Sequence, residues 1–126
     1  MKREILFRGK HIHAVSKNKH LDGTWIYGYL CDENYINSPE LEGEFLIDPE
    51  TICQCTGFTD KNIRKIFEGD IIKWASAIGE VKWYHGNYTG WYVDEIYMGE
   101  QQFTNEMWNE CEIIGNIFDN PELIEK

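Results

Sequence analysis

The stretch Phe67-Glu-Gly-Asp-Ile-Ile-Lys-Trp74 carries the clearest structural signal in the sequence. Gly69 stands directly before Asp70, and this pair suits a tight turn because glycine adopts positive φ without steric cost. A strand is predicted after the turn, with Ile72 and Trp74 on one face. The stretch therefore predicts the entry to a small β-structure, with Asp70 as a turn residue.

A second strand is predicted after Gly79, in the segment Glu80-Val-Lys-Trp-Tyr84. Its apolar residues, Val81 and Trp83, alternate with charged ones, which predicts one covered face and one face in water. Three side chains are expected in the core: Trp74, Val81 and Trp83.

Short elements are predicted on both sides of these two strands. Downstream we expect a turn over 85–90, a strand over 91–97, a short helix within 100–111, a strand over 112–118 and a helical tail at 120–122. Upstream we expect strands over 4–15 with a break at Gly9, over 25–30 and over 45–47, with a surface loop over the acidic segment 31–43. Short strands joined by glycine-rich turns predict a small barrel in the C-terminal half, because closure removes exposed sheet edges.

Three local signals lie between the two halves. Asp48-Pro49 predicts a helical turn, with an N-cap residue followed by proline at the first helical position. Thr56-Gly57 is expected to end the stretch that begins at Ile52. Asp60-Lys-Asn62 predicts a turn, since Asp and Asn side chains bond to their own backbone.

The charge of the chain is unevenly distributed. The net charge is −10, but residues 1–30 carry six Lys and Arg against two acidic residues, a charge of +4, and the remainder carries −14. An acidic body argues against non-specific DNA binding, where cations must replace the counterions of the phosphates. We expect the basic arm, which includes Arg3 and Arg8, to contact the acidic body of its own chain or of a neighbouring subunit. Contact of the arm with nucleic acid is the alternative.

The location of the protein is predicted from its apolar runs. The run after the first basic residues is three residues long, too short for a signal peptide, and no run is long enough to span a bilayer. We expect a cytoplasmic protein, without membrane contact, whose four cysteines are free thiols. Cys31 and Cys111 are expected to be small buried apolar residues.

A series of motifs runs through the chain in a fixed order: Arg3 with Phe7-Arg8, Trp25-Ile-Tyr-Gly28, Asp48-Pro-Glu-Thr-Ile52, Gln54-Cys-Thr-Gly57, Asp60-Lys-Asn62, Ile66-Phe-Glu-Gly-Asp-Ile71, Gly79-Glu-Val-Lys-Trp83 and Ile114-Gly-Asn-Ile-Phe-Asp-Asn-Pro-Glu-Leu123. With these motifs the sequence resembles the YopX family, which is encoded mostly by bacteriophages and prophages of low-GC Gram-positive bacteria. The resemblance spans nearly the whole chain.

The resemblance implies a mainly β fold with two parts. An N-terminal β region with the basic arm is expected over residues 1–59, and a C-terminal SH3-like barrel over residues 60–126, with one or two short helical turns. It also implies a homo-oligomer without an established biochemical activity. One position departs from the family pattern, since Ile63 stands where a glycine usually follows Asp-Lys-Asn. A β-branched residue adopts positive φ only at a cost, so we expect a longer or differently shaped turn.

Two patterns imitate metal sites. Cys53 and Cys55, with His11 and His13, would supply four zinc ligands, but the pairs lie about forty residues apart and lack the usual Cys spacing. Asp70 followed by Glu80 and Lys82 imitates a metal-dependent nuclease. A turn residue and the water-facing positions of an alternating strand explain these three residues better. No nucleophile elbow or phosphate-binding loop is present in the sequence. We therefore expect no catalytic residue, no metal and no cofactor.

The aromatic residues leave two functions open. Exposed aromatics on a small β-structure either hold a polypeptide or stack on nucleic-acid bases, and Tyr84 and Tyr92 are expected at the surface. We predict a non-enzymatic homo-oligomeric protein-interaction module that contacts itself and a host or phage protein. Nucleic-acid binding is the alternative, and a metal-dependent nuclease is the least favoured. The predicted contact residues are Trp25, Tyr27, Tyr84, Tyr92, Arg3 and Arg8.

Overall fold

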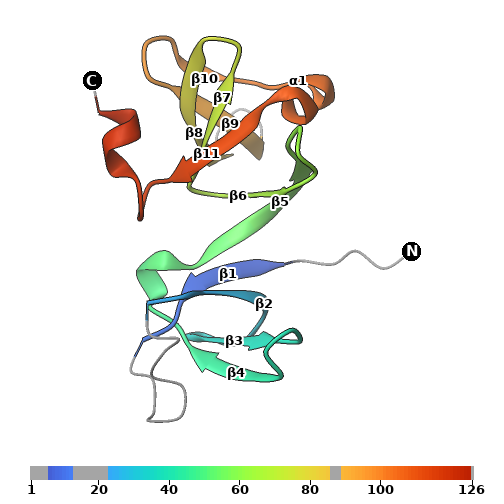
Figure 1. Ribbon diagram of the computed structural model, residues 1–126, viewed down its shortest axis with the longest axis vertical. Helices are drawn as coiled ribbons and strands as arrows, with labels where there is room; N and C mark the ends of the chain where they lie inside the picture. Colours follow the sequence, from blue (N-terminus) through green and yellow to red (C-terminus); the bar gives the residue numbers. More distant parts are fainter. Residues whose placement is uncertain (1–5, 13–22, 86–88, 126) are drawn as a thin grey trace. The chain divides into compact units, whose positions relative to one another are not determined.

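The computed structural model describes residues 6–12, 23–85 and 89–125, without the side chains of residues 84, 85 and 89. Nearly all of the regular structure is antiparallel strand, so the predicted mainly β fold is confirmed. The chain divides into two compact units, Met1–Cys55 and Thr56–Lys126 (Figure 1). Compactness alone does not define a domain, and the predicted domains 1–59 and 60–126 stay a prediction.

The first unit is built on an antiparallel sheet in the order β4-β3-β2-β1, with the first residues of β5 beyond β1. Its elements are β1 (Phe7–Lys10), β2 (Trp25–Asp32), β3 (Tyr35–Ser38), β4 (Gly43–Leu46), the 3-10 helix η2 (Pro49–Thr51) and β5 (Cys53–Thr59). The predicted cap of η2 is confirmed, because the carboxylate of Asp48 accepts the Glu50 N–H at 3.1 Å.

The core of the first unit explains two errors of prediction. Gly9 does not break the first strand but lies buried within β1, where a Cβ atom would clash with the side chain of Ile47. The segment 31–43 is not a surface loop, because it contains all of β3 and the fully buried Ile36. The acidic residues around β3 hide its four-residue alternation of exposed and buried positions. The core consists of Ile26, Ile36, Phe45 and Ile47, with Phe7 and Ile52 packed against it.

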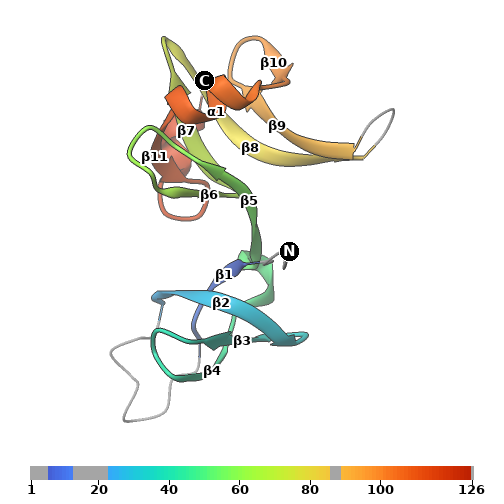
Figure 2. The same cartoon turned by 90° about the vertical axis from the view of Figure 1, so that its right-hand side faces the viewer.

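The second unit contains a five-stranded antiparallel sheet in the order β10-β9-β8-β7-β11. Its elements after β5 are β6 (Lys65–Phe67), β7 (Asp70–Trp74), β8 (Ala77–His85), β9 (Thr89–Glu95), β10 (Gly99–Gln101), α1 (Asn105–Glu110), β11 (Glu112–Asn116) and the 3-10 helix η3 (Pro121–Ile124). Figure 2 shows β8 and β9 as a long hairpin beside β10 and α1. Within the described residues, β10 and β11 remain the two edges of this sheet, and their pairing does not close it into a barrel.

The core of the second unit lies between the sheet and α1. Its buried residues are Ile66, Ile72, Val81, Val93, Trp108 and Cys111. Phe58 stacks on Trp108 with ring centroids 4.9 Å apart, and Trp74 packs against the cluster as predicted. Trp83 was expected in this core but is only half-buried, and it packs edge-on against Trp91 with ring centroids 4.7 Å apart.

The predicted helix is confirmed as the short α1. The hydroxyl of Thr104 accepts the Met107 N–H at 3.2 Å and caps the first turn. In the described part of the chain, no helix is long and apolar enough to cross a membrane.

The predicted turn at Gly69 and Asp70, directly before β7, is confirmed. Gly69 has φ +85°, and the buried carboxylate of Asp70 accepts the Phe67 N–H at 2.8 Å. The Gly69 N–H in turn bonds to the Val81 carbonyl at 2.9 Å. Asp70 is therefore the residue that closes this turn, as predicted.

Two other positions have positive φ. The prediction that the stretch ends at Thr56-Gly57 is wrong, because β5 runs through Gly57 with φ +89°. Ile63 takes the left-handed conformation, φ +63°, which a β-branched residue adopts only at a cost. The expected difference in turn shape from the family stays a prediction. The carboxylate of Asp60 holds the N–H groups on both sides, of Asn62 and of Arg64, and so stabilises the strained position.

Candidate functional site

An apolar opening lies in the second unit, on the face of the sheet that Gly79 and Val93 share. Its cavity has a volume of about 410 Å³, in the range of ligand-binding pockets. The β-strands supply its floor, and the segment before and within α1 supplies one wall. The apolar lining includes Ile72, Trp74, Val93, Met98, Phe103 and Met107.

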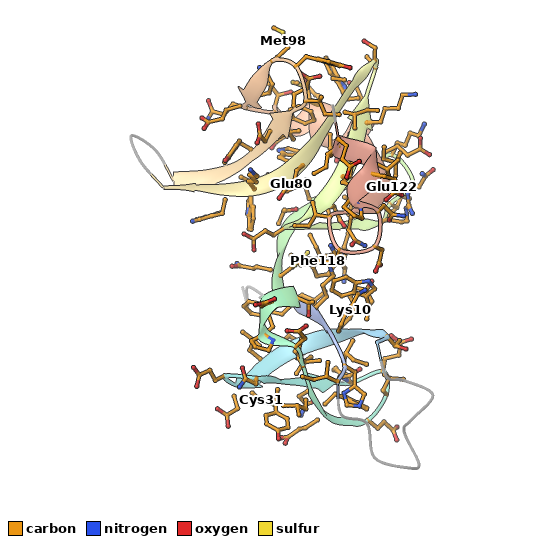
Figure 3. All side chains as sticks on the ribbon, turned by 90° about the vertical axis from the view of Figure 1, so that its left-hand side faces the viewer. Lys10, Cys31, Glu80, Met98, Phe118 and Glu122 are labelled. Carbon is orange, nitrogen blue, oxygen red and sulfur yellow. The ribbon has the colours of Figure 1, made fainter. Side chains whose placement is uncertain are left out.

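The rim of this apolar pocket is the turn between β9 and β10. Tyr97 and Met98 stand at its tip with 83% and 75% of their surface exposed, and Figure 3 shows Met98 projecting outward. The buried Glu95 fixes the turn, because its carboxylate accepts the N–H of Tyr97 at 2.8 Å and the N–H of Met98. Two large apolar side chains are thus held in water beside an apolar cavity, an arrangement typical of interaction sites.

A second, polar pocket of about 390 Å³ lies on the opposite face of the same strands. Side chains alternate between faces along a strand, so Glu80 and Asp94 point away from the face of Gly79 and Val93. The two pockets share Glu95, Tyr97 and Met98 in their lining. The β9–β10 turn is therefore a ridge that separates an apolar pocket from an acidic one.

The electrostatics of the acidic pocket are unfavourable for Glu80. Glu80 lies directly opposite Asp94 in the β8–β9 pair, and like charges in this position destabilise a sheet. Lys82 bonds to Asp94, with Nζ 3.0 Å from Oδ2. Burial raises the pKa of Glu80; Asp94 and Glu68 raise it further, against the opposing charge of Lys82. Among the residues that the structure describes, the Glu80 carboxylate makes no hydrogen bond or ion pair.

Three of the predicted contact residues meet on one face of the first unit. Arg8 lies opposite Tyr27, and Lys10 lies opposite Trp25, in the β1–β2 pair. The guanidinium carbon of Arg8 is 4.7 Å from the Trp25 ring centroid, a cation–π contact. Tyr27 is exposed, whereas Arg8 is buried with 5% of its surface exposed.

The other predicted contact residues do not join this cluster. Tyr92 was expected at the surface but is 8% exposed, and it shares its face of the sheet with the fully buried Ile71. Burial raises the pKa of the Tyr92 hydroxyl. Arg3 and the side chain of Tyr84 lie outside the described residues.

The fold does not bring together the residues of the two patterns that resemble metal sites. Ile71 lies opposite Glu80, so Asp70, one residue earlier in β7, projects to the other face of the sheet. The Cys53 thiol donates to the Thr51 carbonyl at 3.3 Å, and His11 Nδ1 lies 2.7 Å from the Leu46 carbonyl. His13 lies outside the described residues, among which no group of three or more His, Cys, Asp and Glu side chains gathers.

The cysteines divide between surface and core. Cys31 was expected to be buried but is exposed on β2, so this prediction is wrong. Cys111 is fully buried as predicted, and burial raises its pKa to about 11, so it is an unreactive thiol at neutral pH.

A family model described as YopX protein matches residues 8–125. The chain belongs to the YopX family. A comparison with curated proteins finds no match. The YopX match includes both units, the ridge and both pockets of the second unit, and the aromatic cluster of the first.

Proposed function

We propose that this YopX protein is a non-enzymatic accessory protein of a phage or prophage, acting in the bacterial cytoplasm as a homo-oligomeric protein-interaction module. The observation that carries the proposal is the apolar pocket with Tyr97 and Met98 exposed at its rim. Exposed apolar side chains beside a preformed cavity bury surface when a protein partner binds, and buried apolar anchors supply most of the affinity of such contacts.

Charge supports association between copies of the chain. Residues 56–126 carry 6 Lys and Arg against 13 Asp and Glu, whereas residues 1–30 are basic. A basic segment of one copy and the acidic second unit of another attract each other and fix their mutual orientation.

We also propose that the second unit is an SH3-like barrel. The order β10-β9-β8-β7-β11 supports this, because β11 returns from the end of the chain to pair with β7. The short α1 before β11 covers one side of the strands with Trp108.

Size-exclusion chromatography with light scattering tests the oligomer. We expect the wild-type chain to elute above its single-chain mass of 14.9 kDa and the double variant Tyr97→Ser, Met98→Ser to shift towards that mass. The matched control is Ile63→Ser, which removes an equally exposed apolar side chain (83%) away from the pocket. A wild-type monomer at micromolar concentration, or an equal shift in the control, contradicts the proposal.

Nucleic-acid binding is the second candidate, and one observation favours it. Arg8, Lys10, Trp25 and Tyr27 share one face of the first unit, and a cation beside aromatic rings is how single strands are held. Binding to a labelled single strand should weaken steeply as salt rises and fall on substitution Tyr27→Ser. Absence of any binding at low salt excludes this candidate.

A further inference from the structure

We propose that the ridge selects a polypeptide segment that carries a bulky apolar side chain and, close to it, a Lys or Arg side chain. The apolar side chain enters the apolar pocket, and the cation enters the acidic pocket beside Glu80. The inference rests on the proposed function and names the chemistry of the segment that the ridge binds.

The arrangement of the two pockets supports a segment that places one side chain in each of them. The apolar and acidic pockets lie on opposite faces of β8 and β9 and meet at Tyr97 and Met98. Consecutive side chains of an extended segment point in opposite directions. A segment that crosses the ridge therefore places one side chain on each side of it, and the two pockets accept different chemistries.

The charges in the acidic pocket support a Lys or Arg side chain beside Glu80. Glu80 and Asp94 face each other, and Lys82 bonds to Asp94 alone. Within the described residues, the half-buried Glu80 carboxylate makes no ion pair, and it shares the charge of Lys82 with Asp94. A Lys or Arg of the partner supplies a second positive charge, whereas a Glu at that position of the partner is repelled. Such complementarity fixes specificity and orientation more than total affinity.

The occupant is a polypeptide and not a small cation. The apolar pocket needs a bulky side chain, and the rim residues Tyr97 and Met98 bury their apolar surface only against a further chain. The second unit is acidic overall, so a basic segment is attracted to it before the apolar side chain docks.

The experiment measures peptide binding to the full chain by fluorescence anisotropy. The probes are labelled eight-residue peptides of Gly and Ser that carry one Phe or Leu, and either Lys or Glu one to four positions from it. At the best spacing, the Lys peptide should bind about tenfold more tightly than the Glu peptide.

Two variants locate the two contacts. Glu80→Gln keeps the shape of the side chain and should reduce the preference for Lys to less than about twofold, while peptides with Phe alone keep their affinity. Glu110→Gln, an exposed change in α1 that lines neither pocket, should leave the preference intact. Tyr97→Ser with Met98→Ser should weaken binding of every anchored peptide.

A salt titration of the wild-type chain gives a measurement that does not depend on the folding of a variant. The preference for Lys should fall between about 0.1 M and about 1 M salt, because the screening length shortens from about 10 Å to about 3 Å. Binding of Phe peptides that is indifferent to Lys or Glu overturns the inference and leaves the proposed function standing. If no anchored peptide binds and Tyr97→Ser, Met98→Ser leaves the oligomer unchanged, the proposed function falls with it.

Discussion

The carboxylate of Asp60 joins two backbone segments of the second unit through three N–H groups. It is 3% exposed and accepts the N–H groups of Asn62, Arg64 and Ile113 at 2.9, 3.0 and 3.0 Å. The Arg64 guanidinium adds a contact at 3.3 Å and also donates to the Ile113 carbonyl at 2.6 Å. The turn after β5 and the beginning of β11 thus share one anion.

Asp60→Asn should destabilise the chain by about 1–3 kcal/mol. The amide keeps one oxygen but turns an NH₂ group towards backbone N–H groups that need an acceptor. Urea unfolding measures the change, with the exposed Glu110→Gln as the control. A loss below about 0.5 kcal/mol would show that Asp60 does not hold these segments.

The carboxylate of Asp60 also makes the stability of the fold depend on pH in the acid range. Burial raises the pKa of Asp60, but hydrogen bonds from Ile113, Arg64 and Asn62 and the charge of Arg64 outweigh it, so the pKa is lowered overall. A lowered pKa gives stability that is present above the unfolded value of about 3.9 and is lost as the pH falls through the folded value. The stability difference between wild type and Asp60→Asn should therefore shrink below about pH 4. A difference that stays constant from neutral pH to pH 3 would contradict this.

The ionisation of Glu80 has the opposite effect on stability from that of Asp60. The pKa of Glu80 is raised, first by burial and then by Asp94 and Glu68, so its ionisation weakens the fold as the pH rises above the unfolded value of about 4.3. Glu80→Gln should stabilise the chain at pH 7 by about 1 kcal/mol or less, and the gain should vanish below about pH 4. Thermal unfolding at the two pH values measures it. A destabilised variant at pH 7 would mean that Glu80 serves the fold and not a partner.

At the scale of elements, the conformation of the β9–β10 turn depends on the carboxylate of Glu95. Glu95→Ala removes the acceptor of the Tyr97 and Met98 N–H groups, so both amides should exchange hydrogen faster, and stability should fall by about 1–3 kcal/mol. Amide exchange followed by NMR measures this, with Glu100→Ala on the exposed side of β10 as the control. Unchanged exchange at both amides would show that the ridge is held by other contacts.

Alternation of apolar and charged residues predicted that β7 and β8 are strands, but it did not predict that Ile71 and Ile72 are both buried or that Trp83 lies outside the core. It failed at β9, where Ile96, Tyr97 and Met98 continue the apolar pattern and hide the end of the strand. The turn is set by a buried carboxylate that bonds to the backbone, a contact that periodicity does not reveal. Two large apolar residues directly before Gly99 were the signal that could have indicated an exposed ridge, since turns usually carry small polar residues.

At the scale of the whole molecule, the YopX resemblance and the mainly β fold followed from the sequence, and the candidate site did not. The pocket gathers residues from 72 to 107, so it exists only once β7, β8, β9 and α1 have packed. The meeting of Arg8 with Trp25 likewise depends on the register of β1 and β2. The aromatic content predicted a contact surface, but not the side chains that form it. Tyr92, which was expected there, is buried, whereas Tyr97 is exposed.

The central claim is that the ridge contacts a second protein chain, and site-specific photo-crosslinking tests it most directly. A photoreactive phenylalanine derivative replaces Met98 in one variant and Ile63, which is also largely exposed, in the other. The purified Met98 variant should yield a crosslinked species of twice the 14.9 kDa chain mass on irradiation, and the Ile63 variant should yield none. Equal crosslinking from both positions, or none from position 98, would contradict the account.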